Sequence, residues 1–378
     1  MALKKVIIAP DSFKGALSAG EAADIIAGEI HKAFPDCEVI KMPIADGGEG
    51  SVDAVLSAIG GRILSADVLS PDKRQIEATY GIAGNGLAII EMAQSSGITR
   101  QLELNPMTSN TYGFGELILA AINNITKKEF TLCIGGSATT DGGCGMAAAL
   151  GVKFTDKRGS SFIPCGETLC NIAGIDTSCI DERIKASKFT VMCDVDNPLF
   201  GEKGAAYIYS PQKGADPEQV IILNAGLRHY GAILSNHFDR DFSEIPGAGA
   251  AGGLGAGCMA FLNAELKSGI DTILELYNFT KNLKGTDLII TGEGKLDSQS
   301  FQGKVLSGIK RSAAGVPIMV ICGINKCDPK LLEELGIKVF EASEGITAEE
   351  SIKEPAKYLK RAAKKAALSI KTENRPLS

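Results

Sequence analysis

The sequence predicts an α/β protein in which a doubly wound domain is interrupted by a second, inserted α/β domain. Three observations support this fold class. Short apolar segments alternate with amphipathic helical segments near both ends of the chain. The middle of the chain contains hairpin signals and long loops instead. A length of 378 residues also suits two domains of ordinary size.

The first forty residues follow the order strand, polar loop, helix. Val6–Pro10 is a short apolar segment, and Ser18 and Glu21 have capping-box spacing before the helical periodicity of residues 22–34. Three polar residues occupy the loop after the strand: Asp11, Ser12 and Lys14. Ligands of open α/β sheets bind beyond the carboxyl ends of strands, so these residues are candidates for substrate binding. Taken alone, Lys14 is better explained as an ordinary solvated loop lysine than as a binding residue.

The same order then repeats. Residues 38–44 are predicted to form a strand, and residues 51–59 a helix that Gly60 ends. The loop between them reads A-D-G-G-E-G, and its candidate binding residues are Asp46, Gly47 and Gly48. Aspartate is also a favoured helix cap, so Asp46 could serve that purpose alone.

The pattern changes after residue 70. Residues 75–82 and 87–92 alternate like strands around Ala83–Gly86, which predicts a β-hairpin. Further elements of the middle region are predicted as helices at 111–122 and 217–234 and a strand at 189–193. The α/β alternation then returns with strands at 287–290, 317–322 and 337–341, a loop at 291–297, and helices at 305–314, 330–335 and 349–368. The predicted domains are therefore residues 1–70 plus 285–378, and residues 71–284.

The most informative stretch is 133–145, which reads C-I-G-G-S-A-T-T-D-G-G-C-G. It follows a predicted buried strand at 130–134 and precedes a predicted helix at 146–150. This arrangement directs backbone N–H groups and the positive end of a helix dipole at an anion, and glycine permits a close approach. The candidate phosphate- or substrate-binding residues here are Gly135, Gly136, Ser137, Thr139 and Asp141. A tight turn in a glycine-rich fold is the alternative.

A second glycine-rich loop, 246–255, precedes a helix predicted to end near residue 266. Its candidate binding residues are Gly247, Gly249, Gly252 and Gly253. The loop contains the pattern G-x-G-x-x-G, but residues 242–246 before it do not form a buried-strand pattern. That context argues against a dinucleotide fingerprint. The glycines still suit a close approach of the backbone to a polyanion.

Composition excludes several classes of protein. A net charge of −6 and an isoelectric point near 5.4 argue against a nucleic-acid or membrane-surface binder. After Lys4 and Lys5, an apolar run of only five residues leads to Asp11, too short for the core of a signal peptide, so a cytoplasmic location is expected. Ten cysteines without C-x-x-C spacing predict reduced thiols, and three histidines make a zinc site improbable. A bound metal is therefore expected to be Mg²⁺ on carboxylates.

Eight motifs in this order resemble one family, the bacterial glycerate kinases of the first type. They are A-P-D-S-F-K-G at 9–15, A-D-G-G-E-G at 45–50, Y-G-F-G-E-L-I at 112–118, I-G-G-S-A-T-T-D-G-G-C-G-M at 134–146, C-D-V-D-N-P-L at 193–199, P-Q-K-G-A at 211–215, P-G-A-G-A-A-G-G-L-G at 246–255 and I-T-G-E-G-K-L-D-S-Q-S at 290–300. The likeness covers nearly the whole chain. Thr140 and Lys295 depart from the family pattern, where Asn and Arg are common.

The resemblance implies an activity and a fold. Such enzymes transfer the γ-phosphoryl group of ATP to D-glycerate with Mg²⁺, and the bacterial members mostly produce 2-phosphoglycerate. The family fold is a flavodoxin-like α/β domain interrupted by a second α/β domain. Asp194 matches the position of the proposed catalytic base. From its place before Asn197 and Pro198 alone, Asp194 could equally be a turn residue.

Phosphoryl transfer requires positioning and charge neutralisation, and the remaining candidates are assigned on that basis. Lys14 is predicted to be catalytic together with Asp194, and Lys213 to neutralise phosphate charge. Glu293 and Gly294, in the last matching motif, are predicted to bind substrate or phosphate. Asp46 and Asp196 are the predicted metal ligands, with Asp141 a further candidate carboxylate.

Two other functions are weighed against the kinase. The glycine loops would also suit a nucleotide-dependent oxidoreductase that acts on a small hydroxy acid, or a non-catalytic protein that binds a small acid. The expected partners are D-glycerate and ATP, with no nucleic acid and no membrane. Whether the chain forms a homodimer is left open by the sequence.

Overall fold

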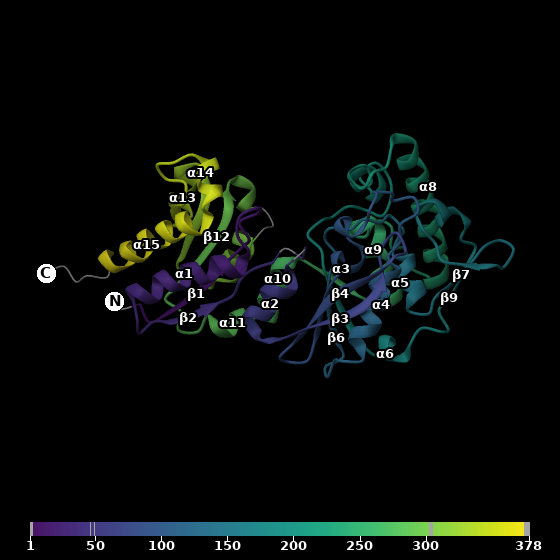
Figure 1. Cartoon of the computed structure of the whole chain (residues 1–378), viewed down its shortest axis with the longest axis horizontal. Helices are drawn as coiled ribbons and strands as arrows, with labels where there is room; N and C mark the ends of the chain where they lie inside the picture. The colour runs from purple at the N-terminus through teal and green to yellow at the C-terminus, as the bar shows by residue number, and fades with distance from the viewer. Residues whose placement is uncertain (1–2, 46, 49, 302–304, 374–378) are drawn as a thin grey trace. The chain divides into compact units, whose positions relative to one another are not determined.

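The computed structural model describes residues 3–45, 47–48, 50–301 and 305–373. The chain divides into two compact units, each considered by itself (Figure 1). Unit 1 comprises Met1–Asp46, Asp53–Ile59 and Ile270–Ser378, and unit 2 comprises Gly47–Val52 and Gly60–Gly269. Both units combine helices with β-sheets, which confirms the predicted α/β class.

Unit 1 is built on a five-stranded sheet in the order β14-β13-β12-β1-β2. The strands are β1 (Lys5–Pro10), β2 (Glu38–Lys41), β12 (Leu288–Leu296), β13 (Ile318–Asn325) and β14 (Lys338–Glu341). All neighbours are parallel, and Ile7 lies between Ile40 and Ile289 in the register. All five strands therefore end at the same edge of the sheet. Strand β1 has a neighbour on each side, and its apolar sequence suits burial on both faces of the sheet.

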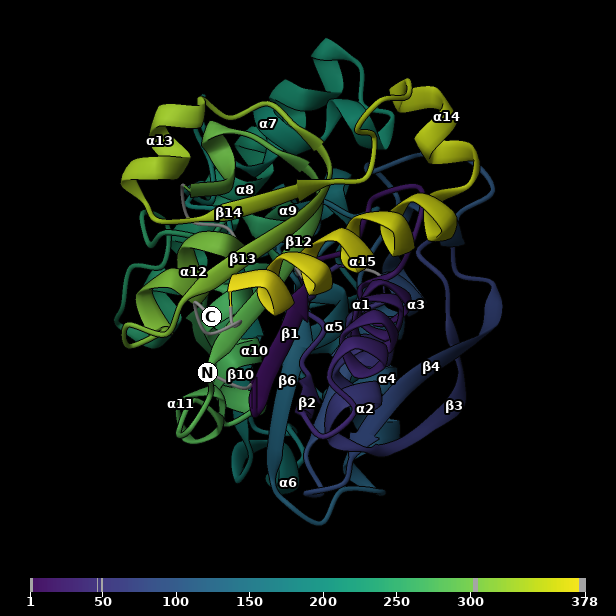
Figure 2. The same cartoon turned by 90° about the vertical axis from the view of Figure 1, so that its left-hand side faces the viewer.

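Helices cover both faces of this sheet. The helices of this part of the chain are α1 (Ala19–Ala33), α2 (Ser51–Ile59), α10 (Gly269–Leu276), α11 (Phe279–Asn282), α12 (Val305–Ser312), α13 (Pro329–Glu334), α14 (Ala348–Lys353) and α15 (Pro355–Glu373). Met319 and Ile321 of β13 pack in the cluster with α1 and α15, and Val320 and Cys322 in the cluster with α12 and α13. Figure 2 shows α15 crossing the sheet beside α1. The predicted capping box of Ser18 and Glu21 is present at the start of α1.

Unit 2 contains a six-stranded mixed sheet in the order β11-β10-β6-β5-β4-β3. Its strands are β3 (Gly61–Leu69), β4 (Gln75–Ala83), β5 (Ala88–Glu91), β6 (Glu129–Cys133), β10 (Lys188–Met192) and β11 (Glu265–Lys267). Strands β3, β4 and β5 are antiparallel neighbours, which confirms the predicted hairpin, whereas β5, β6, β10 and β11 are parallel. A separate three-stranded antiparallel sheet has the order β8-β7-β9, with β7 (Lys153–Thr155), β8 (Ser161–Phe162) and β9 (Gly174–Asp176).

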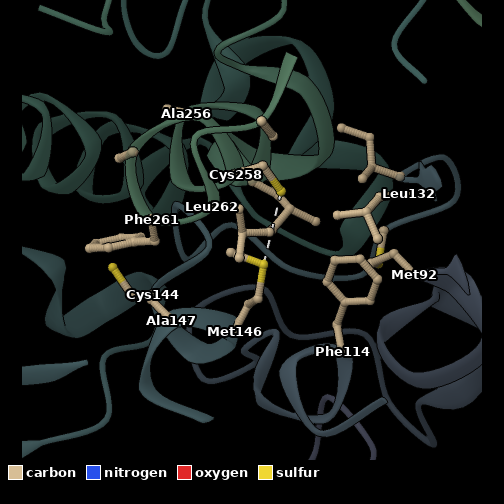
Figure 3. Packing of buried hydrophobic residues seen from close by; sticks show 14 of the residues in the cluster. Met92, Phe114, Leu132, Cys144, Met146, Ala147, Ala256, Cys258, Phe261 and Leu262 are labelled. Atoms are coloured by element: carbon tan, nitrogen blue, oxygen red, sulfur yellow. Dashed lines mark hydrogen bonds between the residues drawn. The ribbon is translucent and has the colours of Figure 1, made fainter. Parts of the chain in front are cut away.

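The helices of unit 2 position its glycine-rich loops. They are α3 (Ala93–Ser96), α4 (Tyr112–Ile122), α5 (Cys144–Ala149), α6 (Glu182–Lys185), α7 (Ala205–Tyr209), α8 (Pro217–Phe238) and α9 (Ala250–Leu262). Helices α5 and α9 carry side chains into one apolar core, where the Cys258 Sγ atom lies 3.9 Å from the Met146 Sδ atom (Figure 3). Burying a side chain such as that of Met146 stabilises the fold by about 1.5–3 kcal/mol relative to leaving it exposed to water. The loops that lead into α5 and α9 are anchored by that core.

Several expected elements differ in the structure. Residues 291–297 were expected to be a loop, but β12 continues to Leu296 because β13 supplies backbone partners as far as Asn325. The single closing helix at 349–368 is instead α14 and α15, separated at Glu354, because Pro355 disfavours a helical conformation in the residue before it. Residues 61–69, expected in the first domain, pair with β4 in unit 2. Across the described part of the chain, no helix is long and apolar enough to cross a membrane.

Candidate functional site

In unit 1, the candidate residues gather where β1 and β12 end. The Asp11 N–H donates to the Gly292 carbonyl oxygen at 2.7 Å, which continues the pairing of the two strands into the loop. The Ser12 N–H donates to Asp11 Oδ1 at 2.6 Å. Asp11 is therefore an ordered, half-buried carboxylate at the strand edge, as the strand-end argument predicted.

The remaining unit 1 candidates lie beside this loop. A Cβ atom added at Gly294 would lie 3.5 Å from the Lys14 backbone nitrogen, so β12 and the loop are in van der Waals contact. Glu293 precedes Gly294 in β12 and is half-buried, whereas the Lys14 side chain is exposed. The structure thus brings together the five candidates of unit 1 that it describes, although Glu293 and Gly294 lie in a strand and not in the expected loop.

In unit 2, the loops that follow three neighbouring parallel strands share one edge. Cys133, which ends β6, pairs with Glu91 of β5 and with Met192 of β10. The Gly135 N–H donates to the Gly47 carbonyl oxygen at 3.1 Å, so the loop before α2 also reaches this edge. The candidates Gly47, Gly48, Gly135 and Gly136 are therefore neighbours, because a Cβ atom at Gly135 would lie 3.0 Å from Gly48 Cα.

Asp141 is the organising residue of the loop after β6. Its side chain has no exposed surface, and Oδ2 accepts hydrogen bonds from the Thr111 N–H at 2.8 Å, the Thr111 Oγ1 hydroxyl at 2.8 Å and the Gly145 N–H at 3.0 Å. Oδ1 accepts from the Gly143 N–H at 3.2 Å. Burial raises the pKa of Asp141, and the four donated hydrogen bonds oppose that rise. The N–H groups of Gly143 and Gly145, which lie in the stretch predicted to bind an anion, therefore donate to this carboxylate instead.

Lys213 is buried beside the same loop. Its Nζ atom donates to Ser137 Oγ at 2.6 Å and to the Thr139 carbonyl oxygen at 2.5 Å, and only 2% of the residue is exposed. Burial lowers the pKa of Lys213 to about 7, and the nearby charge of Asp141 opposes this shift. The Thr139 Oγ1 atom is buried without a hydrogen-bond partner among the described residues. A lysine amino group and a hydroxyl group are thus held inside the glycine-rich loop.

The glycines of the second loop are explained by loop-to-loop packing. The Gly142 N–H donates to the Gly252 carbonyl oxygen at 3.0 Å. Gly252 has a φ of +72°, and a Cβ atom there would overlap the Thr139 carbonyl oxygen. At Gly253, with a φ of +90°, a Cβ atom would lie 2.9 Å from Gly142 Cα. Residues 251–253, although inside the bounds of α9, have non-helical backbone angles. Their glycines allow this stretch to be in direct backbone contact with the loop at 139–143.

The loop after β10 carries the two exposed candidate carboxylates, Asp194 and Asp196. Asp194 Oδ1 accepts the N–H of Gly269 at 2.7 Å. The Gly249 N–H donates to the Asn197 carbonyl oxygen at 2.9 Å, and a Cβ atom at Gly247 would lie 2.9 Å from Cys193 Sγ. The glycines at 247 and 249 therefore hold the second glycine-rich loop against the segment that presents Asp194.

Two residues of this region were missed by sequence reasoning. Glu91 is 2% exposed, and its Oε1 atom accepts the Val52 N–H at 2.7 Å, which satisfies a donor at the start of α2. Thr111 donates to Asp141 and accepts the Met146 N–H at 2.9 Å. A carboxylate that ends an apolar strand was a usable signal for Glu91. Nothing local marks Thr111, because its partners lie 30 and 35 residues away.

Of the two predicted metal ligands, the structure describes Asp196. Asp46 lies outside the described residues, as do Glu49 and residues 302–304. Within the ranges that are described, no group of three or more His, Cys, Asp or Glu side chains is placed to hold a metal ion. Asp196 is nevertheless an exposed oxygen donor, and Mg²⁺ is commonly bound by one or two carboxylates together with substrate phosphates and water.

Comparison with known proteins identifies the family of the chain. The model of the glycerate kinase family matches residues 6–371. The chain belongs to this family. A curated glycerate kinase from Bacillus cereus is 42% identical over 94% of this chain and 97% of its own length. The glycerate 2-kinase of Escherichia coli is 41% identical over 88% of each chain.

A solved structure agrees with the glycerate kinase assignment. The crystal structure of a candidate glycerate kinase 2 from Salmonella typhimurium LT2 matches with a TM-score of 0.87 and 35% identity, over 98% of this chain and 99% of that one. The comparisons confirm the predicted family and, with it, the prediction that the chain is an enzyme. Neither the oxidoreductase nor the binding-protein alternative is favoured by them.

Proposed function

We propose that the chain transfers the γ-phosphoryl group of ATP to D-glycerate, assisted by Mg²⁺, and that the product is 2-phosphoglycerate. The observation that carries this proposal is the exposed Asp194 carboxylate, held by the Gly269 N–H at the strand edge of unit 2. Membership of the glycerate kinase family supports the substrate, and the printed name of the Escherichia coli relative supports phosphorylation at the 2-hydroxyl.

Asp194 is proposed as the general base. One of its oxygens is oriented by a backbone N–H, and the residue remains exposed to an incoming hydroxyl group. A carboxylate in that position would accept the proton of the attacking glycerate hydroxyl, while its orientation limits the geometries of attack.

Lys14 and Lys213 are proposed to neutralise the negative charge of the phosphate groups or of the glycerate carboxylate. Lys14 is exposed beside Asp11, Ser12 and Glu293, where it can reach a ligand beyond the strand edge of unit 1. Lys213 is buried and is proposed to act from beneath Ser137 and Thr139, where it makes the loop electropositive. Both remain candidates for binding phosphate or the glycerate carboxylate.

The metal is proposed to be held by Asp196 and Asp46. When bound, Mg²⁺ would neutralise charge on the phosphate oxygens of the nucleotide. The exposed carboxylate of Asp196 has the hard oxygen donors that this ion prefers. Asp141 is not proposed as a ligand, because four hydrogen bonds from its own unit already occupy its oxygens.

We further propose that unit 1 is a flavodoxin-like, doubly wound domain. Counted along unit 1 alone, its strands have the spatial order 2-1-3-4-5, which is the flavodoxin-like order. In that order the switch point lies between the first and third strands, here β1 and β12. The candidates Asp11, Ser12, Lys14, Glu293 and Gly294 all lie there. A cytoplasmic location remains a prediction.

Phosphorus NMR of the product of D-glycerate and Mg·ATP tests the proposal directly. We expect a phosphomonoester signal coupled to the single proton at carbon 2. A signal coupled to the two protons at carbon 3 would overturn the assigned position, and a failure to consume ATP in the presence of D-glycerate would overturn the reaction. Repeating the assay with L-glycerate at the same concentration measures the stereochemical preference.

A further inference from the structure

A basic groove in unit 1 is lined by residues of helices α1 and α15, the contacting pair that Figure 2 shows. Its volume is about 570 Å³. The lining comes from these two helices only: Glu29, Lys32, Ala33, Lys357, Lys360, Arg361, Lys364, Ala367, Leu368 and Lys371. None of these residues belongs to the candidate functional site.

The charge of the groove is opposite to that of the chain. Six of the lining residues are basic and one is acidic, whereas the whole chain has a net charge of −6. Basic side chains brought together repel one another over the Debye length of about 8 Å at physiological ionic strength. A groove of this kind raises the local concentration of anions.

Three of the basic residues are committed to partners in the protein. Lys32 Nζ lies 2.6 Å from Glu29 Oε1, and Lys357 pairs with Glu354 at 2.6 Å. Arg361 donates to the backbone carbonyl oxygens of residues 342 and 344. These contacts leave the guanidinium and the two ammonium groups only partly available to a ligand.

The other three, Lys360, Lys364 and Lys371, have no ion pair with any residue that the structure describes. They are exposed, and their spacings of four and seven residues place them along one side of α15. The opposite side of this helix is buried through Leu359, Ala363 and similar apolar residues. The lysines are thus presented by a helix whose position is fixed by packing.

We propose that this groove binds a soluble small molecule that carries several phosphate groups. Its volume is within the range of small-molecule sites, about 300–1,000 Å³. Lysine ammonium groups are compact point charges that suit phosphate oxygens without imposing a planar geometry. Among the described lining residues there is no aromatic ring, so the groove lacks the stacking surface of a single-strand nucleic-acid site.

The test measures binding of inorganic tripolyphosphate to the full chain by calorimetry at about 0.15 M salt. The wild type is expected to bind with a Kd below about 1 mM and to bind more weakly at higher salt. The variant K360Q/K364Q/K371Q should lose affinity by about tenfold, because it removes three exposed charge contacts. Glutamine preserves helix propensity at these positions, and an unchanged melting temperature verifies the fold.

A matched control removes three exposed lysines of unit 2. The variant K128Q/K157Q/K188Q has the same net charge as the groove variant, and its affinity should stay within about twofold of the wild type. Equal loss in both variants would mean that only net charge matters, and would overturn the site. Undiminished binding in the groove variant would place the anion elsewhere, including at the proposed nucleotide site, and would overturn the groove as well. Binding to phosphatidylglycerol vesicles but not to tripolyphosphate would replace a soluble ligand with a membrane surface.

Discussion

The loops after β6 and β10 both carry aspartates, yet the structure uses Asp141 of the first loop and Asp194 of the second differently. Asp141 follows β6, has no exposed surface and accepts four hydrogen bonds from its own unit. Asp194 follows β10, is exposed and has one oxygen oriented by the Gly269 N–H. A carboxylate in a strand-end loop can therefore organise the loop or act on a ligand, and its burial distinguishes the two. The same substitution, aspartate to asparagine, separates these roles.

The largest expected effect is that of Asp194→Asn on catalysis. The amide keeps an oxygen for the Gly269 N–H, so the fold should persist, but it cannot accept the hydroxyl proton. We expect kcat to fall by about 10²–10⁴-fold, the usual range for a general base. A coupled assay of ADP formation measures this. A melting temperature equal to that of the wild type is the control, and a loss of less than tenfold would remove Asp194 from the mechanism.

Asp141→Asn is expected to act on stability instead. An asparagine can offer one oxygen to the three donors now at Oδ2, but its NH₂ group would then face the Gly143 N–H. The free energy of unfolding should fall by about 2–3 kcal/mol, the scale of a lost hydrogen bond to a charged group. Urea unfolding measures it.

The control for Asp141 is Asp156→Asn. Asp156 also accepts two backbone N–H groups, from Arg158 and Ser160, but lies in an exposed turn. Its substitution should cost less than about 1 kcal/mol, because both N–H groups donate to Oδ1, an asparagine oxygen can accept both, and water reaches the amide group. If the two variants lost equal stability, burial would not be what distinguishes Asp141.

Sequence reasoning predicted the order of strands and helices well but not the difference between these two aspartates. The α1 capping box and the β4–β5 hairpin depend on neighbours in sequence, and both are present. The burial of Asp141 depends on Thr111, which arrives from a distant segment. The extension of β12 through Gly292 and Gly294 likewise depends on the flanking strand β13. Local patterns contain no information about such partners.

Gly252→Ala tests whether the second glycine-rich loop is shaped by contact with the first. The alanine would combine a φ of +72° with an overlap at the Thr139 carbonyl oxygen. Gly159→Ala is the matched control, because its φ is +81° and nothing lies within 4 Å of the added atom. Both variants should lose about 1 kcal/mol from the positive φ. We expect Gly252→Ala to lose about 2 kcal/mol more from the overlap, by urea unfolding. Equal losses would mean that the loops separate easily.

The smallest expected effect concerns the buried Lys213. Because its pKa is lowered to about 7 in the folded protein, the unfolded chain binds more protons between pH 7 and the ordinary pKa of lysine. Stability contributed by this group therefore rises with pH across that window and is lost as the pH falls through 7. The wild type should gain up to about 1 kcal/mol per pH unit over Lys213→Met between about pH 7.5 and 9.

Urea unfolding at about pH 7.5 and about pH 9, inside that window, measures the difference in unfolding free energy between the wild type and Lys213→Met at each pH. Lys157→Met, at an exposed position, should follow the wild type at both values. If Lys213→Met also had the wild-type pH dependence, the lysine would be charged at neutral pH despite its burial. The loop around Ser137 and Thr139 would then hold a permanent cation, which strengthens the case for anion binding there. It would also weaken the contrast between a structural loop after β6 and a catalytic loop after β10.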